Sequence, residues 1–259
     1  MTERRFKRRP RSMRKGIYLL PNLITTASLF CGFLSIIASF KEQFFKAAAA
    51  ILIAGILDGL DGKIARFTNT TSRFGVEYDS LSDAVAFGIA PALLAYTWSL
   101  NTFGRYGWVA AFLYAVCGVL RLARFNVQIG VIDSKVFNGL PIPAAAAVVA
   151  TSVLIYGYLE NGGQFNHPAM LAVMILLAFL MISSVKYYSF KDLNYFTRKP
   201  FMTLVLSVLL FLIIIMEPQL VLFVLALSYA VSGPISTIVR TFRKRSIEEQ
   251  EEASGRGMR

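Results

Sequence analysis

The chain has 259 residues, of which 56% are hydrophobic and 16% are charged, and its formal net charge is +12. Soluble domains carry roughly 25% charged residues, so this composition and a mean hydropathy of +0.57 exclude an ordinary soluble protein. The apolar residues gather in long blocks, and a helix needs about 20 of them to cross a bilayer. We therefore predict a polytopic membrane protein.

The N-terminal leader is strongly basic, with eight lysines and arginines before residue 16. No base-reading module follows it, so we predict no nucleic-acid partner. A basic leader beside a first span usually reports membrane topology and contact with anionic lipid headgroups. The first apolar run starts after this leader and has no small-residue cleavage site, so we expect no cleavable signal peptide.

Eight apolar segments follow one another along the chain, separated by polar or turn-forming residues. They predict an all-α bundle of about eight transmembrane helices at approximately 18–39, 45–66, 79–100, 106–125, 141–159, 168–186, 201–216 and 219–239. We divide the chain into a basic leader at 1–16, a membrane domain at 17–240 and a polar tail at 241–259.

Lysines and arginines are distributed very unevenly between the two sides of these predicted spans. With the N-terminus in the cytoplasm, all but three of the 27 fall on the cytoplasmic side, the exceptions being Lys41, Lys46 and Arg105. Cytoplasmic loops of membrane proteins carry such an excess. We therefore predict cytoplasmic termini and an even number of spans.

Two pairs of aspartates lie at the predicted cytoplasmic ends of spans two and three. Asp58 and Asp61 are three residues apart and Asp79 and Asp83 are four apart, so each pair shares one helix face. The polar linker FTNTTSRFG between the pairs allows the two helices to fold back on each other. Four neighbouring carboxylates cannot stay ionised in a low dielectric without compensation. Oxygen ligands without histidine or cysteine favour Mg²⁺ or Mn²⁺ over zinc, so we predict one or two such ions.

Small residues surround these acids and leave room for a large ligand. Gly59, Gly62, Ala65 and Gly75 remove bulk, and Arg66 follows Gly62 by one helical turn, a spacing that suits pairing with phosphate. Taken alone, the glycines are better explained by helix packing. A cap or an arginine pair explains one intramembrane aspartate but not four, because intramembrane charge is costly. The residues together predict a metal–diphosphate site that faces the cytosol.

The same stretch resembles the motif of the CDP-alcohol phosphotransferase family, D-x2-D-G-x2-A-R-x8-G-x3-D-x3-D, and matches it at every fixed position. Members of that family are integral membrane enzymes that move a phosphoryl-linked group from a CDP-linked donor to an alcohol and release CMP. The resemblance implies that Asp58, Asp61 and Asp79 bind two metal ions. It also implies that Asp83 completes the metal site and acts as the base for the incoming hydroxyl.

The resemblance further implies a set of contacts to the CDP-linked donor. The implied donor contacts are Pro21, Asn22, Thr25, Gly62, Arg66, Ser72 and Gly75. The first span of the family often opens with a Pro-Asn pair and a nearby threonine beside the nucleotide, and Pro21-Asn22 and Thr25 match that arrangement. From the residues alone, the Pro-Asn pair is equally well explained as a helix start.

Three further stretches, RLARFN at 121–126, FNGLPIPAAAA at 137–147 and KYYSFKDLN at 186–194, are similar to the branch of the family whose acceptor is serine. This similarity implies CDP-diacylglycerol as donor and L-serine as acceptor. The implied serine contacts are Arg121, Arg124, Asn126, Ser189 and Lys191. An arginine can hold the serine carboxylate bidentately. The alternative for these cations is a topological role with snorkelling stems, although intramembrane arginines usually face a cavity.

Several functional alternatives remain open at this stage. Glycerol 3-phosphate or an inositol phosphate would keep the chemistry but require a denser basic pocket. An ion-coupled transporter would use the carboxylates differently, although no second half of the chain mirrors them. A non-catalytic lipid-binding scaffold would tolerate loss of single aspartates. The resemblance also implies a homodimer, and we expect a bacterial inner membrane with the active site facing the cytoplasm.

Overall fold

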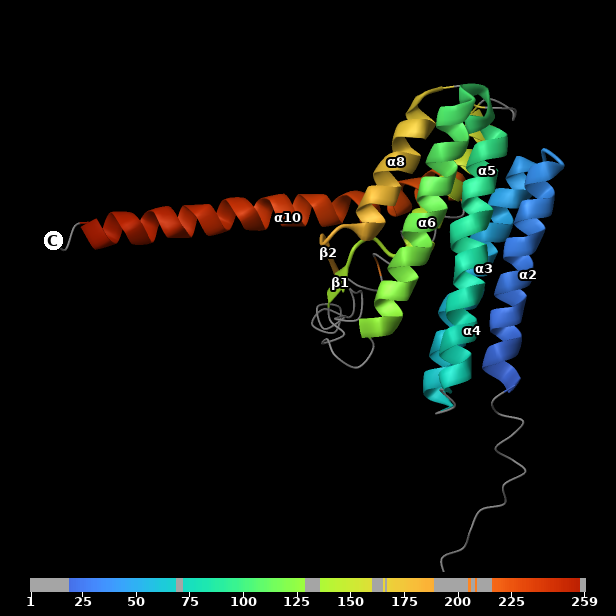
Figure 1. Ribbon diagram of the computed structural model, residues 1–259, viewed down its shortest axis with the longest axis horizontal. Coiled ribbons are helices and arrows are strands. Elements are labelled where there is room, and N and C mark those ends of the chain that lie inside the picture. Colours follow the sequence, from blue (N-terminus) through green and yellow to red (C-terminus); the bar gives the residue numbers. More distant parts are fainter. Residues whose placement is uncertain are drawn as a thin grey trace, which may run out of the picture.

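The computed structural model describes residues 19–68, 72–128, 136–159, 165, 167–188, 205, 208 and 216–256. Within these ranges the chain forms a bundle of long helices (Figure 1). The elements in chain order are α2 (Leu19–Phe40), α3 (Phe44–Phe67), α4 (Arg73–Asp83), η1 (Ala84–Ile89), α5 (Ala90–Trp98), η2 (Leu100–Phe103), α6 (Arg105–Gln128), β1 (Val136–Asn138), α7 (Ile142–Leu159), α8 (Ala169–Ile182), β2 (Lys186–Tyr188) and α10 (Pro218–Arg256).

The predicted helical bundle is confirmed for the described part of the chain. Five helical stretches there are long and apolar enough to cross a membrane, namely Leu20–Phe40, Arg73–Trp98, Arg105–Val127, Ile142–Leu159 and Pro218–Thr237. α3 packs along α2 over most of its length but carries several charges near its C-terminal end. The segment predicted at 201–216 lies almost entirely outside the described residues, so the total of eight spans and the orientation of the termini stay predictions.

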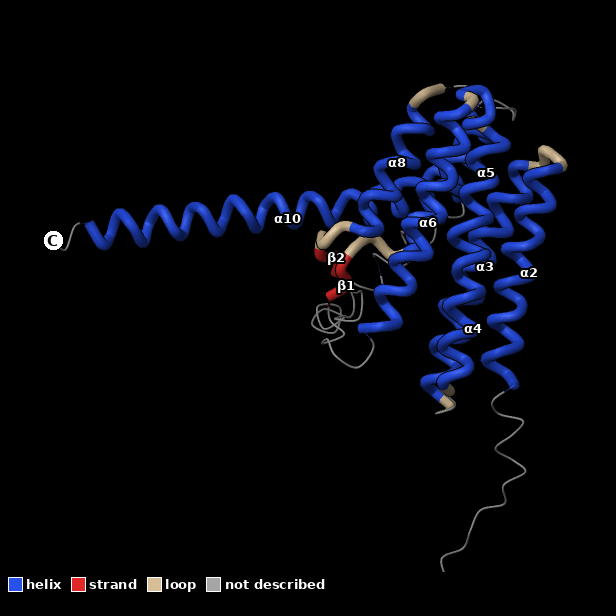
Figure 2. The backbone as a smooth tube through the Cα atoms, viewed as in Figure 1, coloured by secondary structure: helices blue, strands red, loops and turns tan. Residues whose placement is uncertain are grey.

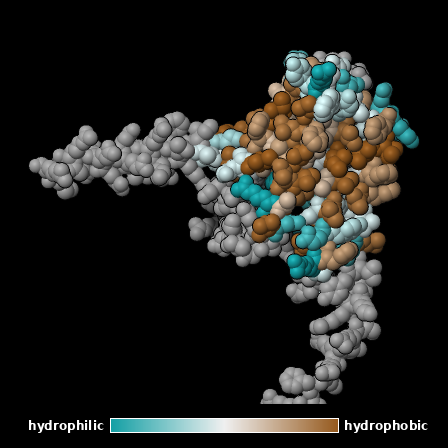
Figure 3. Space-filling view, in the orientation of Figure 1, coloured by the Kyte–Doolittle hydropathy of each residue, from teal (hydrophilic) through white to brown (hydrophobic). Residues whose placement is uncertain are grey.

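The outer surface carries the apolar belt that a bilayer requires. Phe30, Phe112 and Phe179 are 58%, 63% and 64% exposed, although a water-soluble protein would bury such side chains. Figure 3 shows a brown hydrophobic band across the middle of the bundle, with hydrophilic residues at its two ends. The protein is therefore an integral membrane protein.

The helical segment that begins with α4 changes from α-helix to π-helix directly after Asp83. α4, η1 and α5 run on from one another, and η1 is one turn of π-helix. Pro91 lies in the first turn of α5 and has no N–H, so the carbonyl of Phe87 loses its usual helical donor. The buried hydroxyl of Tyr114, on α6, donates to that carbonyl at 3.2 Å. Asp83 therefore lies next to a π-helical turn that a hydrogen bond from α6 stabilises.

α2 makes its closest approach to this π-helical turn at Gly32. A Cβ built on Gly32 would lie 2.6 Å from Cα of Ala86, a distance that side chains do not tolerate. A second tie joins α2 to α3, where the hydroxyl of Ser28 donates to the carbonyl of Ala54 at 3.1 Å. Small residues and interhelical hydrogen bonds are the usual means of association for membrane helices. Together they fix the helix that carries Thr25 against those that carry the aspartates.

A short antiparallel ribbon, drawn in red in Figure 2, departs from the all-helical prediction. β1 pairs with β2, with Val136 opposite Tyr188 and Asn138 opposite Lys186. The chain turns out of β1 at Gly139, whose φ of +82° favours glycine. Three-residue strands are too short to produce a readable alternation of apolar and polar residues, which is why the sequence did not predict them.

We expect Gly32→Ala to lower the melting temperature of the detergent-solubilised protein by ~5 °C, because an atom forced into a packed contact costs ~1–3 kcal/mol. Gly55→Ala is the matched control, since its Cβ would lie 3.8 Å from a ring carbon of Phe87, an ordinary contact. Both changes bring the same gain in helix propensity. Equal melting temperatures for the two variants would contradict the tight contact between α2 and η1.

Candidate functional site

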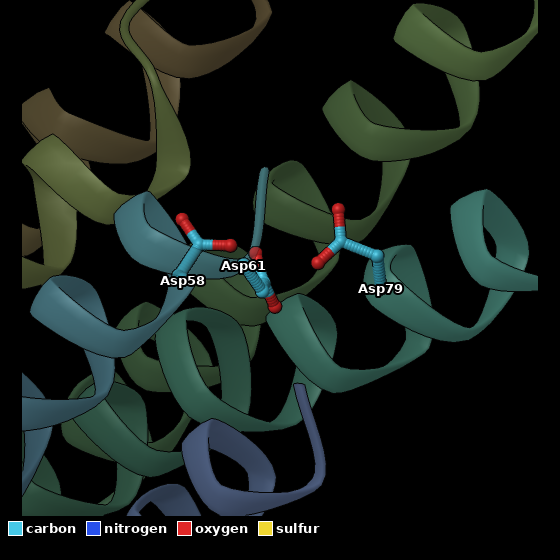
Figure 4. A group of neighbouring side chains, drawn as sticks. All are labelled: Asp58, Asp61 and Asp79. Atoms are coloured by element: carbon cyan, nitrogen blue, oxygen red, sulfur yellow. The ribbon is translucent and has the colours of Figure 1, made fainter. Parts of the chain in front are cut away.

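Three of the four aspartates converge between α3 and α4. One carboxylate oxygen from each of Asp58, Asp61 and Asp79 lies within 4.8 Å of the other two. Figure 4 shows the side chains of Asp58 and Asp61, from α3, and of Asp79, from α4, directed toward a common space. Both helices pack against α2, and carboxylates 18 or more positions apart in the chain meet there.

Asp83 lies one helical turn beyond Asp79, where α4 ends and the π-helical turn begins. Its carboxyl group is in hydrogen-bonding contact with that of Asp58. It therefore adjoins the group of three through Asp58 rather than sharing one close triangle with all of them.

Hydrogen bonds from α2 hold the cluster in place. The hydroxyl of Thr25 donates to Oδ2 of Asp61 at 2.7 Å and also lies 3.1 Å from the carbonyl of Pro21. The hydroxyl of Ser82 on α4 donates to the carbonyl of Thr25 at 3.2 Å. Asp61 is only 4% exposed, so its orientation depends on these buried contacts. A single residue of α2 thus connects both helices that carry the aspartates.

A cavity of about 150 Å³ opens beside this cluster, between α2, α3 and α4. Its lining consists of Pro21, Asn22, Thr25, Asp61, Gly62, Ala65, Ser72, Gly75, Val76 and Asp79. Six of the seven predicted donor contacts are therefore brought together around one space. The seventh, Arg66, belongs to α3, but its side chain lies outside the described residues.

The two glycines that line the cavity, Gly62 and Gly75, differ in the space around them. A Cβ on Gly62 would meet no described atom within 4 Å, so its small size leaves free space rather than helix contact. A Cβ on Gly75 would lie 3.2 Å from the hydroxyl of Ser72 and 3.4 Å from the amide oxygen of Asn22. Ser72 caps α4 by accepting from the N–H of Gly75 at 3.0 Å. The N-terminus of α4 therefore faces the cavity, and helix N-termini favour anions.

The residues of the cluster fit a hard divalent cation. Oδ1 of Asp79 is buried and has no hydrogen-bond partner in the described ranges. Leaving such an oxygen unsatisfied is costly, and neighbouring carboxylates repel one another in a low dielectric. All donors in the group are carboxylate oxygens, the ligands that Mg²⁺, Mn²⁺ and Ca²⁺ take. A bound ion satisfies the orphan oxygen and removes the repulsion.

The predicted acceptor residues fall into three groups. Arg121, on α6, lies within electrostatic reach of Asp83. Arg124 donates from Nη1 to the carbonyl of Ile182 at 3.2 Å, at the end of α8. Asn126 exchanges hydrogen bonds of 2.9 and 3.1 Å with Ser80, the neighbour of Asp79. The remaining two predicted contacts, Ser189 and Lys191, lie outside the described residues.

Several polar residues of the site were not found from the sequence. Ser80 and Ser82 fall at variable positions between the motif aspartates, yet they join α4 to α6 and to α2. Thr26 and Tyr78 share a hydrogen bond of 2.9 Å at the same α2–α4 contact. In the sequence they appear only as polar side chains near the acids, and this pattern does not indicate which residues of other helices they contact.

Comparison with known proteins gives a consistent result. A sequence model of the family described as CDP-alcohol phosphatidyltransferase matches residues 18–179. The matched segment includes all four aspartates, the cavity lining, Arg121, Arg124 and Asn126. The family resemblance drawn from the motif is thereby confirmed.

Curated relatives extend the comparison. A Helicobacter pylori protein named CDP-diacylglycerol–serine O-phosphatidyltransferase is 43% identical over 182 residues, which cover 69% of this chain and 76% of that protein. A protein of the same name from Methanocaldococcus jannaschii is 38% identical over 215 residues, or 83% of this chain and 96% of the relative. An archaetidylserine synthase from Methanothermobacter thermautotrophicus is 38% identical over 170 residues, covering 65% and 69% of the two chains.

We expect Mn²⁺ to raise the melting temperature of the purified protein and Asp79→Asn to abolish most of that rise. A ligand at 100 times its dissociation constant stabilises the folded state by about 2.7 kcal/mol, and the variant removes one of the three converging carboxylates. Glu77→Gln is the matched control, because it removes one negative charge from an exposed position of the same helix. Undiminished stabilisation of Asp79→Asn would rule out ion binding at this cluster.

Proposed function

The chain belongs to the CDP-alcohol phosphatidyltransferase family, and we propose that it is a CDP-diacylglycerol–serine O-phosphatidyltransferase. In this reaction the phosphatidyl group passes from CDP-diacylglycerol to the hydroxyl of L-serine, and CMP is released. The observation that carries the proposal is the convergence of the motif aspartates beside a cavity lined by the donor residues. The names of the relatives supply the choice of serine as acceptor.

The donor fits the cavity between α2, α3 and α4. Its diphosphate lies toward the aspartates and the N-terminus of α4, where helix N–H groups favour negative charge. The open space above Gly62 gives the nucleotide access to the backbone of α3, and Asn22, Ser72 and Arg66 supply polar contacts. The acyl chains stay in the bilayer, which explains why a phosphate-transfer enzyme is built within the membrane.

Asp58, Asp61, Asp79 and Asp83 hold two divalent ions, Mg²⁺ or Mn²⁺, in this proposal. When bound, the ions neutralise the diphosphate and stabilise the CMP leaving group. Thr25 keeps Asp61 in the orientation that binding requires, since its hydroxyl already occupies one of the two carboxylate oxygens. The ligand set is therefore prearranged by α2 before the donor arrives.

Asp83 acts as the base in the transfer step. The serine hydroxyl oxygen forms a new bond to the phosphatidyl phosphorus, the bond from that phosphorus to the CMP oxygen breaks, and Asp83 takes the hydroxyl proton. A carboxylate is a weak base at neutral pH, so it must act on a hydroxyl held close to it. The contact between Asp83 and Asp58 restrains the Asp83 carboxyl group next to the group of three aspartates.

Arg121 binds the serine carboxylate in this reading, because it lies beside Asp83 and carries the fork geometry that matches a carboxylate. Arg124 and Asn126 complete the α6 wall, and Ser189 and Lys191 are proposed further contacts. Asn126 acts chiefly by fixing Ser80 beside Asp79. The opposite wall, formed by the donor cavity, leaves the hydroxyl of serine directed at the phosphorus.

The proposed setting is a bacterial inner membrane, with the site open to the cytoplasm. The strong excess of lysine and arginine on one side supports this orientation, and the same residues attract anionic lipids. We also propose that the protein works as a homodimer, as the family resemblance implies.

Asp83→Asn should lower kcat by about 10²–10⁴-fold, the usual contribution of a general base. CMP release by the purified protein with CDP-diacylglycerol, serine and Mn²⁺ is the measurement. Glu77→Gln again serves as the control for loss of one carboxylate. Retention of more than a tenth of the activity in Asp83→Asn would remove it from the role of base.

A panel of acceptors tests the proposed substrate directly. We expect membranes that contain the protein to form labelled phosphatidylserine from CDP-diacylglycerol and labelled serine, and to use glycerol 3-phosphate or inositol phosphate poorly. Strong product formation from glycerol 3-phosphate and none from serine would contradict serine as the acceptor and favour glycerol 3-phosphate. Two results together would favour the transporter alternative. The protein would take up ions in vesicles and lose this uptake in Asp83→Asn, and it would release no CMP from any CDP-alcohol.

A further inference from the structure

The C-terminal end of α8 is capped by groups from other parts of the chain. The last four carbonyls of a helix have no donor within it, and in α8 they belong to residues 179–182. The carbonyl of Ile182 accepts from Nη1 of Arg124, on α6, at 3.2 Å, and that of Leu180 accepts from the N–H of Leu140 at 3.0 Å. An arginine is stabilising at such an end, because it meets carbonyl oxygens and the negative end of the helix dipole. Arg124 is therefore a cap for α8 that another helix supplies.

The same end of α6 is tied on its other side to α4. Asn126 lies two residues after Arg124, so the two side chains leave the helix about 200° apart. Asn126 exchanges hydrogen bonds of 2.9 and 3.1 Å with Ser80, which directly follows Asp79. α6 also packs along α8. The C-terminal part of α6 is thus held between α8 and the helix that carries Asp79.

A further hydrogen bond joins α6 to the segment that carries the second pair of aspartates. Tyr114 donates to the carbonyl of Phe87 at 3.2 Å, and Phe87 lies four residues after Asp83. Together with the bond to Ser80, this bond places contacts of α6 near both acids of that pair. A shift of α6 would therefore move Asp79 and Asp83 relative to the two aspartates of α3.

The two arginines near the end of α6 differ in their partners. Arg124 already donates to a backbone carbonyl, whereas Nε of Arg121 is buried and has no hydrogen-bond partner within the described ranges. Leaving a buried donor unpaired is unfavourable, and a bound carboxylate would satisfy it. The hydrogen bonds thus distinguish an arginine that serves helix packing from one whose buried donor still lacks a partner.

We propose that Arg124 is a positioning residue: by capping α8 it sets where the C-terminal part of α6 lies, and through α6 it sets the placement of Asp79 and Asp83. The proposal rests on the proposed function, because it takes Arg124 out of the set of serine contacts and leaves the acceptor carboxylate to Arg121. Arg124 then acts on the reaction only through the helix that carries it.

The test compares Arg124→Met and Arg124→Lys with the wild-type protein, in full-length chains purified in detergent and assayed well below their melting temperatures. Methionine keeps an apolar stem and removes every donor, whereas lysine keeps a positively charged donor for the carbonyls of α8. We expect kcat for CMP release to fall about tenfold in Arg124→Met, because a small misplacement of reacting groups lowers the rate steeply. The KM values for serine and CDP-diacylglycerol should stay within about twofold. Arg124→Lys should recover kcat to within about threefold of the wild-type value.

Ser183→Ala is the matched control for loss of a hydrogen bond at the same helix end. The hydroxyl of Ser183 donates to the carbonyl of Leu180 at 2.8 Å, a bond that lies within one turn of the chain. We expect Ser183→Ala to lower the melting temperature by about 2–4 °C and to leave kcat unchanged. Arg124→Met should lower the melting temperature by at least as much and lower kcat as well.

Three results would overturn the proposal. A serine KM about tenfold higher in both Arg124 variants would make this arginine a ligand of the acceptor, since lysine does not replace a bidentate arginine. A kcat that stays unchanged in Arg124→Met, or that falls equally in Ser183→Ala, would reduce Arg124 to a structural cap. A kcat that lysine does not recover would contradict the capping role. If Arg124→Met does not fold, Arg124→Gln takes its place, because its neutral amide keeps a weaker donor.

The proposed function fails by a different result. Wild-type protein that releases CMP only with another alcohol would reject serine as the acceptor, and the kcat values of the variants are then compared with that alcohol. Wild-type protein that forms phosphatidylserine readily, while Arg124→Met keeps its kcat, leaves the function intact and removes the role assigned to Arg124.

Discussion

The structure depends on one electrostatic constraint, the close approach of several carboxylates inside an apolar helix bundle. One carboxylate oxygen from each of Asp58, Asp61 and Asp79 lies within 4.8 Å of the other two, and in a low dielectric their repulsion must be relieved by a bound cation or by protonation. The helices that carry them are packed by contacts that do not involve the acids, such as Gly32 against Ala86. The helix packing therefore keeps the carboxylates close together, and a bound cation would make that arrangement favourable.

Two local features of the bundle lie next to the carboxylates. The π-helical turn after Asp83 appears where Pro91 removes a helical donor, and Tyr114 stabilises the carbonyl that is left free. Thr25 bridges the two helices that carry the acids, through Asp61 on one side and Ser82 on the other. Both features lie next to carboxylates of the cluster, Asp83 in the first case and Asp61 in the second.

Much of the fold and of the site was predictable because both depend on spacing along the chain. Apolar blocks of about 20 residues predict spans, and carboxylates three or four residues apart predict a shared helix face. What escaped prediction depends on contacts between distant segments. For example, the hydrogen-bonded residues Asn126 and Ser80 join α6 to α4 although they lie 46 positions apart in the sequence. The short ribbon escaped because three residues are too few to show a period.

The contrast between Gly62 and Gly75 has a consequence for how the two positions vary among sequences. A Cβ at Gly75 would press on the side-chain oxygens of Ser72 and Asn22, at 3.2 and 3.4 Å, so a larger residue there would disturb the folded chain itself as well as any ligand. A side chain at Gly62 would meet no atom of the described residues within 4 Å, so there it would chiefly hinder a ligand in the cavity. In copies of the enzyme that have lost activity, we therefore expect substitutions to accumulate sooner at Gly62 than at Gly75. This difference would help to distinguish inactive copies from working ones.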